Sequence, residues 1–255
     1  MKVRILGCGG SGGVPLVGGL WGACDPAEQR NRRRRASILV EDEATTLLVD
    51  TSPDLREQLL DAGTRRLDAV LFTHAHADHL HGIDDLRGMN RLVRAALPVY
   101  ADRRTLAVIE ERFDYVFRPL EGASFYKPTL TPHAIEGEFT IGGIRVVPFV
   151  QDHGFSKTLG FRIGGMAYST DVVELDEAAF AALAGTELWI VDCLRYDPHP
   201  THSHLEKTLS WIARVKPRRA VLTHMDVPLD YATLRGKLPP GVEPGYDGLT
   251  LEFGS

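Results

Sequence analysis

The chain has 255 residues, of which 44% are apolar and 25% are charged, proportions that are ordinary for a globular protein. Its formal net charge of −5 argues against a general nucleic-acid or membrane-surface binder, because such proteins gather positive charge. No run of about 18 apolar residues is present, which excludes a transmembrane helix of ordinary length.

The cysteines, Cys8, Cys24 and Cys193, are too few and too widely spaced for a disulfide framework. Their sparse use predicts a reducing compartment, and the apolar run after Met1 is too short for a signal peptide. We therefore expect a cytoplasmic protein. No internal repeat or low-complexity linker interrupts the chain, so we predict one domain over residues 1–255.

Short apolar runs bounded by Gly, Pro or Asp predict strands along the chain. They cover residues 3–6, 36–40, 46–49, 69–73, 144–150, 156–163, 188–193 and 219–223, with a closing strand at 247–253. Helical patterns begin at Ser52 and cover 176–183 and 203–215, with Ser52 and Ser203 as expected N-caps. This order favours an α/β fold in which two sheets pack face to face with helices outside.

The segment His74-Ala75-His76-Ala77-Asp78-His79 carries four potential metal ligands directly after the predicted strand 69–73. Residues two apart in an extended segment point the same way, so His74 and His76 can bind one metal ion. A turn into a helix would direct Asp78 and His79 towards a second ion. Imidazole and carboxylate ligands suit zinc, manganese and iron. The spacing therefore predicts two adjacent metal sites.

Further candidate ligands follow other predicted strands, where a rigid sheet aims loop residues. They are His153, Asp171 and His224. Taken singly, each would more simply be a hydrogen-bonded structural residue. Taken together with the clustered ligands, they predict a complete site in which the carboxylate of Asp171 bridges two ions.

This ligand pattern resembles that of the metallo-β-lactamase superfamily. The resemblance implies a four-layer αβ/βα sandwich of two mixed sheets, with a centre of two divalent ions (zinc or manganese, with iron as a third option) at one edge. It places one ion between His74, His76, His153 and Asp171, and the other between Asp78, His79, Asp171 and His224. It also implies that Asp50, at the end of a strand, orients the ligand loop rather than binding metal.

Two adjacent cations activate water and stabilise charge on the attacked centre, which suits phosphodiesters, thioesters and β-lactams. A bridging aspartate favours the dinuclear branches over the β-lactamases. The stretch 197–205 then supplies three histidines. A cleaved phosphodiester expels an alkoxide, for which a protonated imidazole is a suitable general acid. We favour His202 for this catalytic role, with Asp78 supporting proton transfer, and a solvated or structural role for His199.

The Pro-Thr-His-x-x-Leu pattern at 200–205 and the glycine-rich start at 7–15 resemble the phosphoribosyl cyclic phosphodiesterase (PhnP-like) branch, which is related to the tRNA 3′-end-processing ribonucleases. In that branch a histidine matching His202 is the general acid. Better-known members carry several cysteines after the glycine-rich loop for a structural zinc ion. Here only Cys24 remains, so we expect no such zinc site.

The glycine-rich start fits a dinucleotide-binding loop poorly, because Val14-Pro15 follows where a helix should begin. We expect these glycines to permit tight backbone beside the metal site instead.

The basic run at 30–35 stands out on an acidic protein. Guanidinium groups pair bidentately with phosphate oxygens, so Arg33 and Arg35 are candidate substrate-binding residues, with a solvated loop as the alternative. His204 is a third candidate, because a helix start favours phosphate oxygens. We interpret His133, in a Pro-rich stretch, as a surface-loop residue.

The predicted function is a dinuclear metal-dependent phosphodiesterase acting on a small cyclic phosphate or nucleotide-like diester. Metal hydroxide would attack the phosphorus, and His202 would protonate the leaving oxygen. The expected partner is this small molecule, without a stable nucleic-acid complex and without a membrane, and a homodimer is left open.

Three alternatives are weaker. A tRNase Z-like endoribonuclease would carry a long basic arm, which the sequence lacks. A glyoxalase II-like thioester hydrolase would have a helical C-terminal region, whereas the tail at 239–248 is rich in Pro and Gly. A non-enzymatic binding module would not need the complete ligand set.

Overall fold

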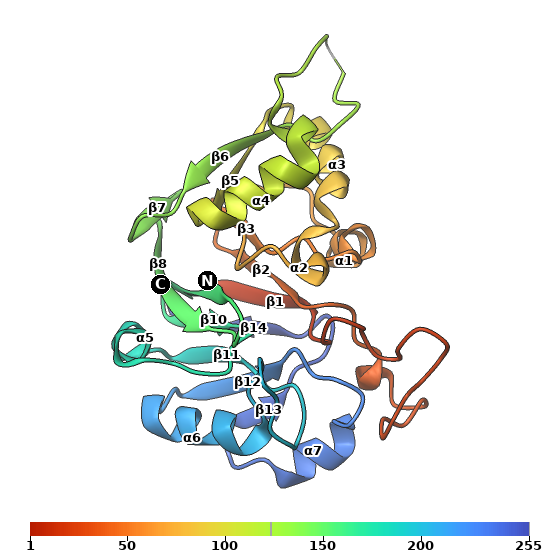
Figure 1. The fold of residues 1–255 in the computed structure, drawn as a ribbon, viewed down its shortest axis with the longest axis vertical. Coiled ribbons are helices and arrows are strands. Elements are labelled where there is room, and N and C mark those ends of the chain that lie inside the picture. The colour runs from red at the N-terminus through yellow and green to blue at the C-terminus, as the bar shows by residue number, and fades with distance from the viewer. Residues whose placement is uncertain (123, 255) are drawn as a thin grey trace.

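Two mixed β-sheets of seven strands each pack face to face in the computed structural model, with helices on their outer faces (Figure 1). The structure describes residues 1–122 and 124–254. This architecture is the metallo-β-lactamase sandwich that the sequence predicts. Within the described ranges, no helix combines the length and the apolar character needed to cross a bilayer.

The first sheet has the strand order β14-β1-β2-β3-β4-β5-β6. Its strands are β1 (Lys2–Gly7), β2 (Ser37–Glu41), β3 (Thr46–Val49), β4 (Ala69–Leu71), β5 (Leu97–Ala101), β6 (Leu130–Ala134) and β14 (Thr250–Glu252). From β3 to β6 neighbouring strands are parallel, and the remaining pairs are antiparallel.

The second sheet has the order β13-β12-β11-β10-β9-β8-β7. Its strands are β7 (Phe139–Ile141), β8 (Ile144–Asp152), β9 (Lys157–Ile163), β10 (Met166–Ser169), β11 (Leu188–Asp192), β12 (Arg219–Thr223) and β13 (Val242–Pro244). From β10 to β13 neighbouring strands are parallel, whereas β7 to β10 are antiparallel.

The helices belong to the crossovers that parallel strands require. Those of the first sheet are α1 (Leu55–Ala62), α2 (Ala77–Leu80), α3 (Leu86–Val93) and α4 (Arg103–Phe113). Those of the second are α5 (Glu177–Leu183), α6 (Leu205–Val215) and α7 (Tyr231–Lys237). Short 3-10 turns cover Gln29–Asn31, Ile83–Asp85 and Asp114–Phe117.

Residues of the first sheet alternate between two hydrophobic cores. On β3, Leu47 and Val49 belong to the core shared with the second sheet, and Leu48 belongs to the core beneath the outer helices. On β4, Leu71 belongs to the core shared with the second sheet, and Val70 belongs to the core beneath the outer helices. Because both faces are buried, these strands appear in the sequence as continuous apolar runs rather than as alternating patterns.

Several predicted elements are confirmed, including β3 and β12 at their predicted bounds. Both predicted serine caps are wrong, because the N-caps of α1 and α6 are Asp54 and His204. The Ser203 hydroxyl instead donates to the main-chain oxygen of Asp192 at 2.7 Å. The backbone thus enters α6 later than predicted, because Ser203 is buried and bonds to the end of β11.

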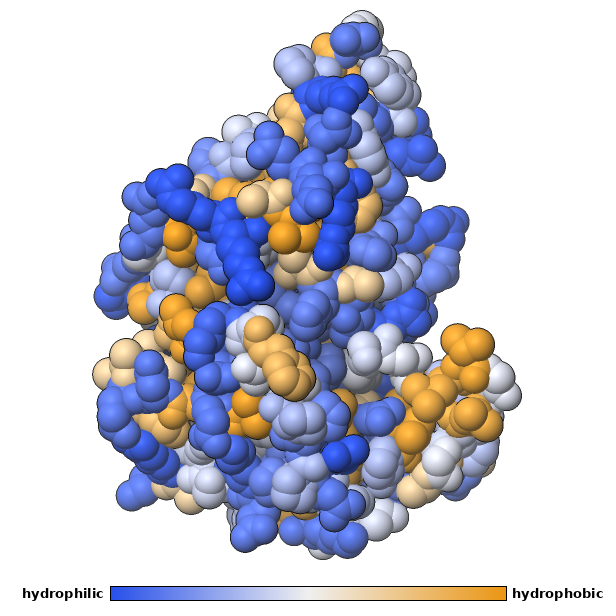
Figure 2. All heavy atoms as spheres, viewed as in Figure 1, coloured by the Kyte–Doolittle hydropathy of each residue, from blue (hydrophilic) through white to orange (hydrophobic). Residues whose placement is uncertain are grey.

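A long segment, residues 8–36, projects from the body between β1 and β2 (Figure 1). Its tip exposes Val17 at 97% and Leu20 at 61%, and Figure 2 shows apolar side chains gathered on this projection. Its base is attached to the N-terminus of α7, because the Asn31 side-chain amide donates to Asp230 Oδ2 at 2.7 Å. The glycine-rich turn lies beside the end of β12, where Met225 N–H donates to the main-chain oxygen of Cys8 at 2.8 Å.

Candidate metal centre

The predicted ligands lie at one edge of the sandwich because of the strand directions. Asp50 and His74 follow the adjacent parallel strands β3 and β4. Asp171 and His224 follow β10 and β12 of the parallel part of the second sheet, and His153 follows β8, which runs in the same direction as β10. Carboxyl ends of parallel strands meet at the same edge, so the fold itself gathers these residues.

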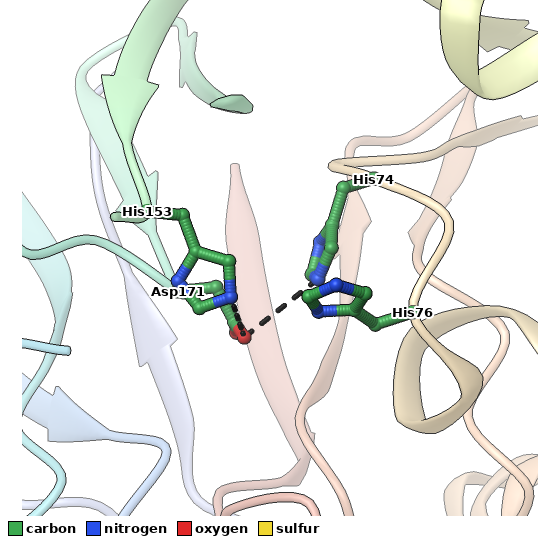
Figure 3. Close-up of side chains that lie close together, drawn as sticks. All are labelled: His74, His76, His153 and Asp171. Atoms are coloured by element: carbon green, nitrogen blue, oxygen red, sulfur yellow. Dashed lines mark ion pairs between the residues drawn. The ribbon is translucent and has the colours of Figure 1, made fainter. Parts of the chain in front are cut away.

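The first group consists of His74, His76, His153 and Asp171, which point towards one another in Figure 3. One ligand atom from each lies within 4.8 Å of those of the others. Asp171 Oδ2 lies 3.7 Å from His74 Nε2 and 3.6 Å from His153 Nε2. All are buried except His76, which is exposed at the mouth of the site.

The second group consists of Asp78, His79, Asp171 and His224, whose ligand atoms also lie within 4.8 Å of one another. Asp171 Oδ1 lies 3.0 Å from His79 Nε2 and 3.3 Å from His224 Nε2. The two oxygens of Asp171 therefore face different groups, Oδ2 the first and Oδ1 the second. This is the geometry that a carboxylate bridging two cations requires.

The donor atoms of this cluster fit divalent metal ions. His74 Nε2 and His79 Nε2 are buried and have no hydrogen-bond partner among the described residues. Buried polar atoms without partners are costly, and a cation coordinated at this point would satisfy both nitrogens. A mixture of imidazole and carboxylate donors suits zinc, manganese or iron.

The electrostatics of the cluster favour a cation. Burial lowers the pKa of His74 and of His153, so both imidazoles are neutral, the form that binds metal. Burial opposes the charged form of Asp171, but the imidazoles of His224 and His79 hold its pKa well below the usual value. Burial also opposes protonation of His224, yet the carboxylates of Asp171, Asp78 and Asp192 together outweigh it and raise this pKa to about 9. The buried carboxylate thus requires positive charge beside it.

Several residues of the cluster have strained backbones. Asp50, Asp171 and His224 have positive φ angles of 65°, 54° and 56°. Left-handed backbone is unfavourable for residues with a Cβ atom, and such strain concentrates at functional sites. At each of these positions the chain turns sharply at a strand end and directs the side chain into the cluster.

Asp50 lies behind the ligands and is fully buried. Its Oδ2 is 2.7 Å from Nδ1 of His79, and Thr73 donates to Asp50 from its main-chain N–H and its hydroxyl, each at 2.8 Å. These bonds fix the ring of His79 with Nε2 towards Asp171, which is how residues behind a metal ligand set its orientation.

His202 lies beside both groups. Its Nδ1 is 3.0 Å from Asp192 Oδ2, its Nε2 is 3.9 Å from Asp171 Oδ2, and its ring stacks on that of His224 with centroids 4.7 Å apart. Asp192, at the end of β11, was not singled out in the sequence. The signal was present, because Asp192 ends a buried apolar run in the same way as Asp50 ends β3.

The predicted substrate-binding residues lie in different surroundings. Arg33 is 2% exposed, and its guanidinium donates to the main-chain oxygen of Leu229 at 2.6 Å and to Asn31 Oδ1 at 3.1 Å. Arg35 Nε lies 3.1 Å from Asp54 Oδ2. His204 is the N-cap of α6 and makes no capping bond with its side chain. The contacts of Arg33 favour a structural role, whereas Arg35 and His204 remain candidates.

The glycine-rich turn passes close to the cluster. A Cβ atom on Gly10 would lie 3.3 Å from the Leu194 side chain and 3.6 Å from the ring of His224. A Cβ atom on Gly7 would lie 2.1 Å from the main-chain oxygen of Arg35, so no other residue fits there. As predicted, glycine permits tight backbone at this point.

The ligand loop has an outer support that the sequence did not reveal. Arg112, near the end of α4, donates from Nη1 to the main-chain oxygen of Ala75 at 3.0 Å. Ala75 lies between His74 and His76, so this bond restrains the loop from the solvent side. A main-chain contact of this kind has no signature in a single sequence.

Comparison with known proteins agrees with this geometry. The family described as "Beta-lactamase superfamily domain" matches residues 45–225. A solved structure described as a new diphosphatase from the PhnP family shares 33% identity, with a TM-score of 0.91 over 99% of this chain and 96% of that one. The chain therefore belongs to the beta-lactamase superfamily and, within it, to the PhnP family.

Curated relatives match only in part of their length. An octanoyltransferase of Porphyromonas gingivalis is 36% identical over 98% of this chain, which spans about half (51%) of that protein. A ribonuclease Z of Bradyrhizobium sp. (strain ORS 278) is 38% identical over 88 residues, which are 33% of this chain and 28% of that protein.

Proposed function

We propose that the protein is a dinuclear metal-dependent hydrolase that cleaves a P–O bond in a small phosphodiester or diphosphate, with His202 as the general acid. The observation that carries this proposal is the position of His202, whose Nε2 lies 3.9 Å from the carboxylate shared by both ligand groups. An imidazole placed there reaches an oxygen that leaves a phosphorus centre held at the cluster.

In this proposal seven residues hold two divalent ions. They are His74, His76, Asp78, His79, His153, Asp171 and His224. Two such ions, when bound, supply Lewis acidity and an activated water. The protein contributes the fixed positions of the donors, all of which are buried except the exposed ring of His76.

His202 would deliver its proton from Nε2, because Nδ1 is engaged by Asp192 at 3.0 Å. A carboxylate bonded to Nδ1 fixes the tautomer and the ring orientation and stabilises the imidazolium, as in other acid–base sites. Asp78 belongs to the second ligand group, where its Oδ2 lies 3.5 Å from His224 Nε2, and we propose that it would support proton transfer from water at the cluster as well as hold a metal ion.

The likeness to a diphosphatase supports a diphosphate as well as a cyclic phosphate as substrate. Both contain a phosphorus centre that is attacked by water and expels an oxygen, so the same residues serve either reaction. Arg35 and His204 are the candidates for binding the non-bridging oxygens.

Nuclease and acyl-transfer activities are weaker alternatives. The ribonuclease Z match covers 33% of the chain, and the net charge of −5 is unfavourable for gripping a polyanion. The octanoyltransferase match covers 51% of that relative, so the match does not tie the transferase activity to the matched half. An octanoyl thioester therefore belongs in the substrate test.

The test is a substrate panel with protein loaded separately with zinc and with manganese. It contains a ribose cyclic phosphate, ADP-ribose, bis(p-nitrophenyl) phosphate, an octanoyl thioester and an unprocessed tRNA. The proposal expects turnover of at least one of the first three and little of the last two. Preferred cleavage of the thioester or of the tRNA would overturn it.

A further inference from the structure

Phe155 is the most exposed aromatic side chain among the large apolar residues of the described chain, at 90%. Several other phenylalanines are buried, for example Phe72 and Phe161 at 0% and Phe149 at 5%, and the remainder are partly buried. An exposed apolar residue alone needs no explanation. Phe155, however, lies two residues after His153, a candidate metal ligand.

The backbone that carries Phe155 is held rigidly. In the hairpin between β8 and β9, His153 N–H donates to the main-chain oxygen of Ser156 at 3.0 Å, and Phe155 N–H donates to that of His153 at 3.0 Å. Asp152 closes the base, because it accepts from Gly154 N–H at 2.7 Å and pairs with Lys157 at 2.5 Å. The ring therefore projects from a fixed turn rather than from a loose loop.

This hairpin is seated against the loop that carries His202. A Cβ atom on Gly154 would lie only 2.6 Å from the main-chain oxygen of Pro200. His153 Nδ1 lies 2.7 Å from the main-chain oxygen of Thr201, which fixes the ring seen entering the cluster in Figure 3. The turn that carries Phe155 thus follows a metal-ligand candidate, His153, and packs against the loop that carries His202.

The exposed aromatic ring of Phe155, so near to candidate metal ligands, suits a ligand that carries both a phosphate and a nucleobase. The Cα atoms of Phe155 and His153 are at most about 7 Å apart, so the ring lies within reach of a group attached to a phosphate at the cluster. Bases stack on aromatic side chains regardless of their hydrogen-bonding pattern, because every base has a π-face.

We propose that Phe155 is a stacking platform that selects substrates carrying a nucleobase, so that the protein acts on nucleotide-type phosphodiesters or diphosphates. This inference rests on the proposed function. The sugar would span the distance between the stacked base and the phosphorus held at the cluster. Substrates without a base would still be cleaved, but they would bind more weakly.

The test compares AMP with ribose 5-phosphate, which carries a hydroxyl at C1′ in place of the base, as ligands of the metal-loaded protein by calorimetry. The wild type should bind AMP about tenfold or more tightly, a gain typical of one base on one aromatic ring. Phe155→Ala should remove this preference and leave ribose 5-phosphate binding unchanged. Phe155→Trp should retain it, with a new fluorescence signal that AMP quenches.

Val150→Ala is the matched control, because Val150 is exposed at 56% on β8, the strand that leads into the hairpin. It should leave the AMP preference intact. A wild type without a preference, or a preference that survives in Phe155→Ala, overturns the inference. If the inference is overturned in either way but the wild type still cleaves phosphodiesters, the proposed function stands. If neither phosphate binds and no phosphodiester is cleaved, both fail.

Discussion

The Oδ2 atom of Asp192 accepts a hydrogen bond from the main-chain N–H of Val172 at 3.0 Å and lies 3.0 Å from Nδ1 of His202. Val172 directly follows Asp171, the carboxylate shared by both ligand groups. One oxygen of Asp192 therefore ties the proposed general acid to the backbone of the proposed bridging ligand. The loop that carries His202 is thereby fixed to the ends of two neighbouring strands, β10 and β11, beside the candidate ligands.

Replacing His202 with alanine should lower kcat by about 10²–10⁴-fold, because the leaving oxygen then departs without a proton. The loss should be larger for a substrate that expels an alkoxide than for bis(p-nitrophenyl) phosphate, whose leaving group is stable as an anion. Metal content, measured by atomic emission, should persist. Equal losses for both substrates would contradict the role of general acid.

Asp192→Asn should reduce kcat by about 10²-fold for the alkoxide substrate, because an amide no longer stabilises the imidazolium or fixes its tautomer. Asp192 is buried and the substitution preserves its shape, so folding should be retained. The same leaving-group dependence should appear as for His202→Ala. Asp197→Asn is the control, because Asp197 is exposed in the loop that follows β11. This variant should leave kcat for both substrates unchanged.

Arg112→Ala should weaken metal binding by about two- to tenfold, the range expected for one hydrogen bond. The reason is the bond from Arg112 to the main-chain oxygen of Ala75, which restrains the loop between His74 and His76. Competition with a chromophoric chelator measures this affinity. Arg104→Ala, at an exposed position on the same helix, should have no effect. An unchanged affinity in Arg112→Ala would show that the loop needs no outer support.

Much of the fold and of the metal cluster can be predicted from this sequence because both follow from strand ends. Buried parallel strands appear as apolar runs, and the polar residue that ends each run must lie at the same edge of its sheet. Asp50, His74, Asp171 and His224 all occupy such positions. Asp192 does too, and it could have been found by the same rule.

The remaining features depend on tertiary contacts that no local pattern encodes. Arg33 sits in a basic run that suggests phosphate binding, yet its guanidinium donates to the main-chain oxygen of the distant Leu229 and to the side chain of the nearby Asn31. Ser203 has the composition of a helix cap, but burial against β11 gives its hydroxyl another partner. In both cases a long-range hydrogen bond overrides the local propensity.

Removing metal with EDTA should lower the melting temperature of the protein by about 5–10 °C. The reference is protein with metal at a hundred times its Kd. The reason is that a ligand bound only by the folded state stabilises that state. Buried His74 Nε2 and His79 Nε2 then lose the partner that we propose for them. Differential scanning calorimetry with and without added zinc or manganese checks this. A melting temperature that is indifferent to both metals and to EDTA would contradict a metal centre at this cluster.

The stability of the protein should fall as the pH rises towards neutrality because of Asp247. Burial raises the pKa of this carboxyl to about 7, even though the main-chain N–H groups of Arg34 and Cys8 donate to it at 2.8 and 3.1 Å. In the unfolded chain the pKa is about 3.9, so the folded state holds the proton more tightly.

This contribution is fully present below about pH 4 and is lost as the pH rises through 7. The Asp247 side chain is only half-buried and lines a surface cavity, so we expect a loss of about 2 kcal/mol rather than the roughly 4 kcal/mol that a fully realised shift of this size would give. Asp247→Asn removes the titrating group. Urea unfolding from pH 4.5 to 8 should therefore show the free energy of unfolding of the wild type falling relative to that of the variant. A difference that does not vary with pH would contradict the shift.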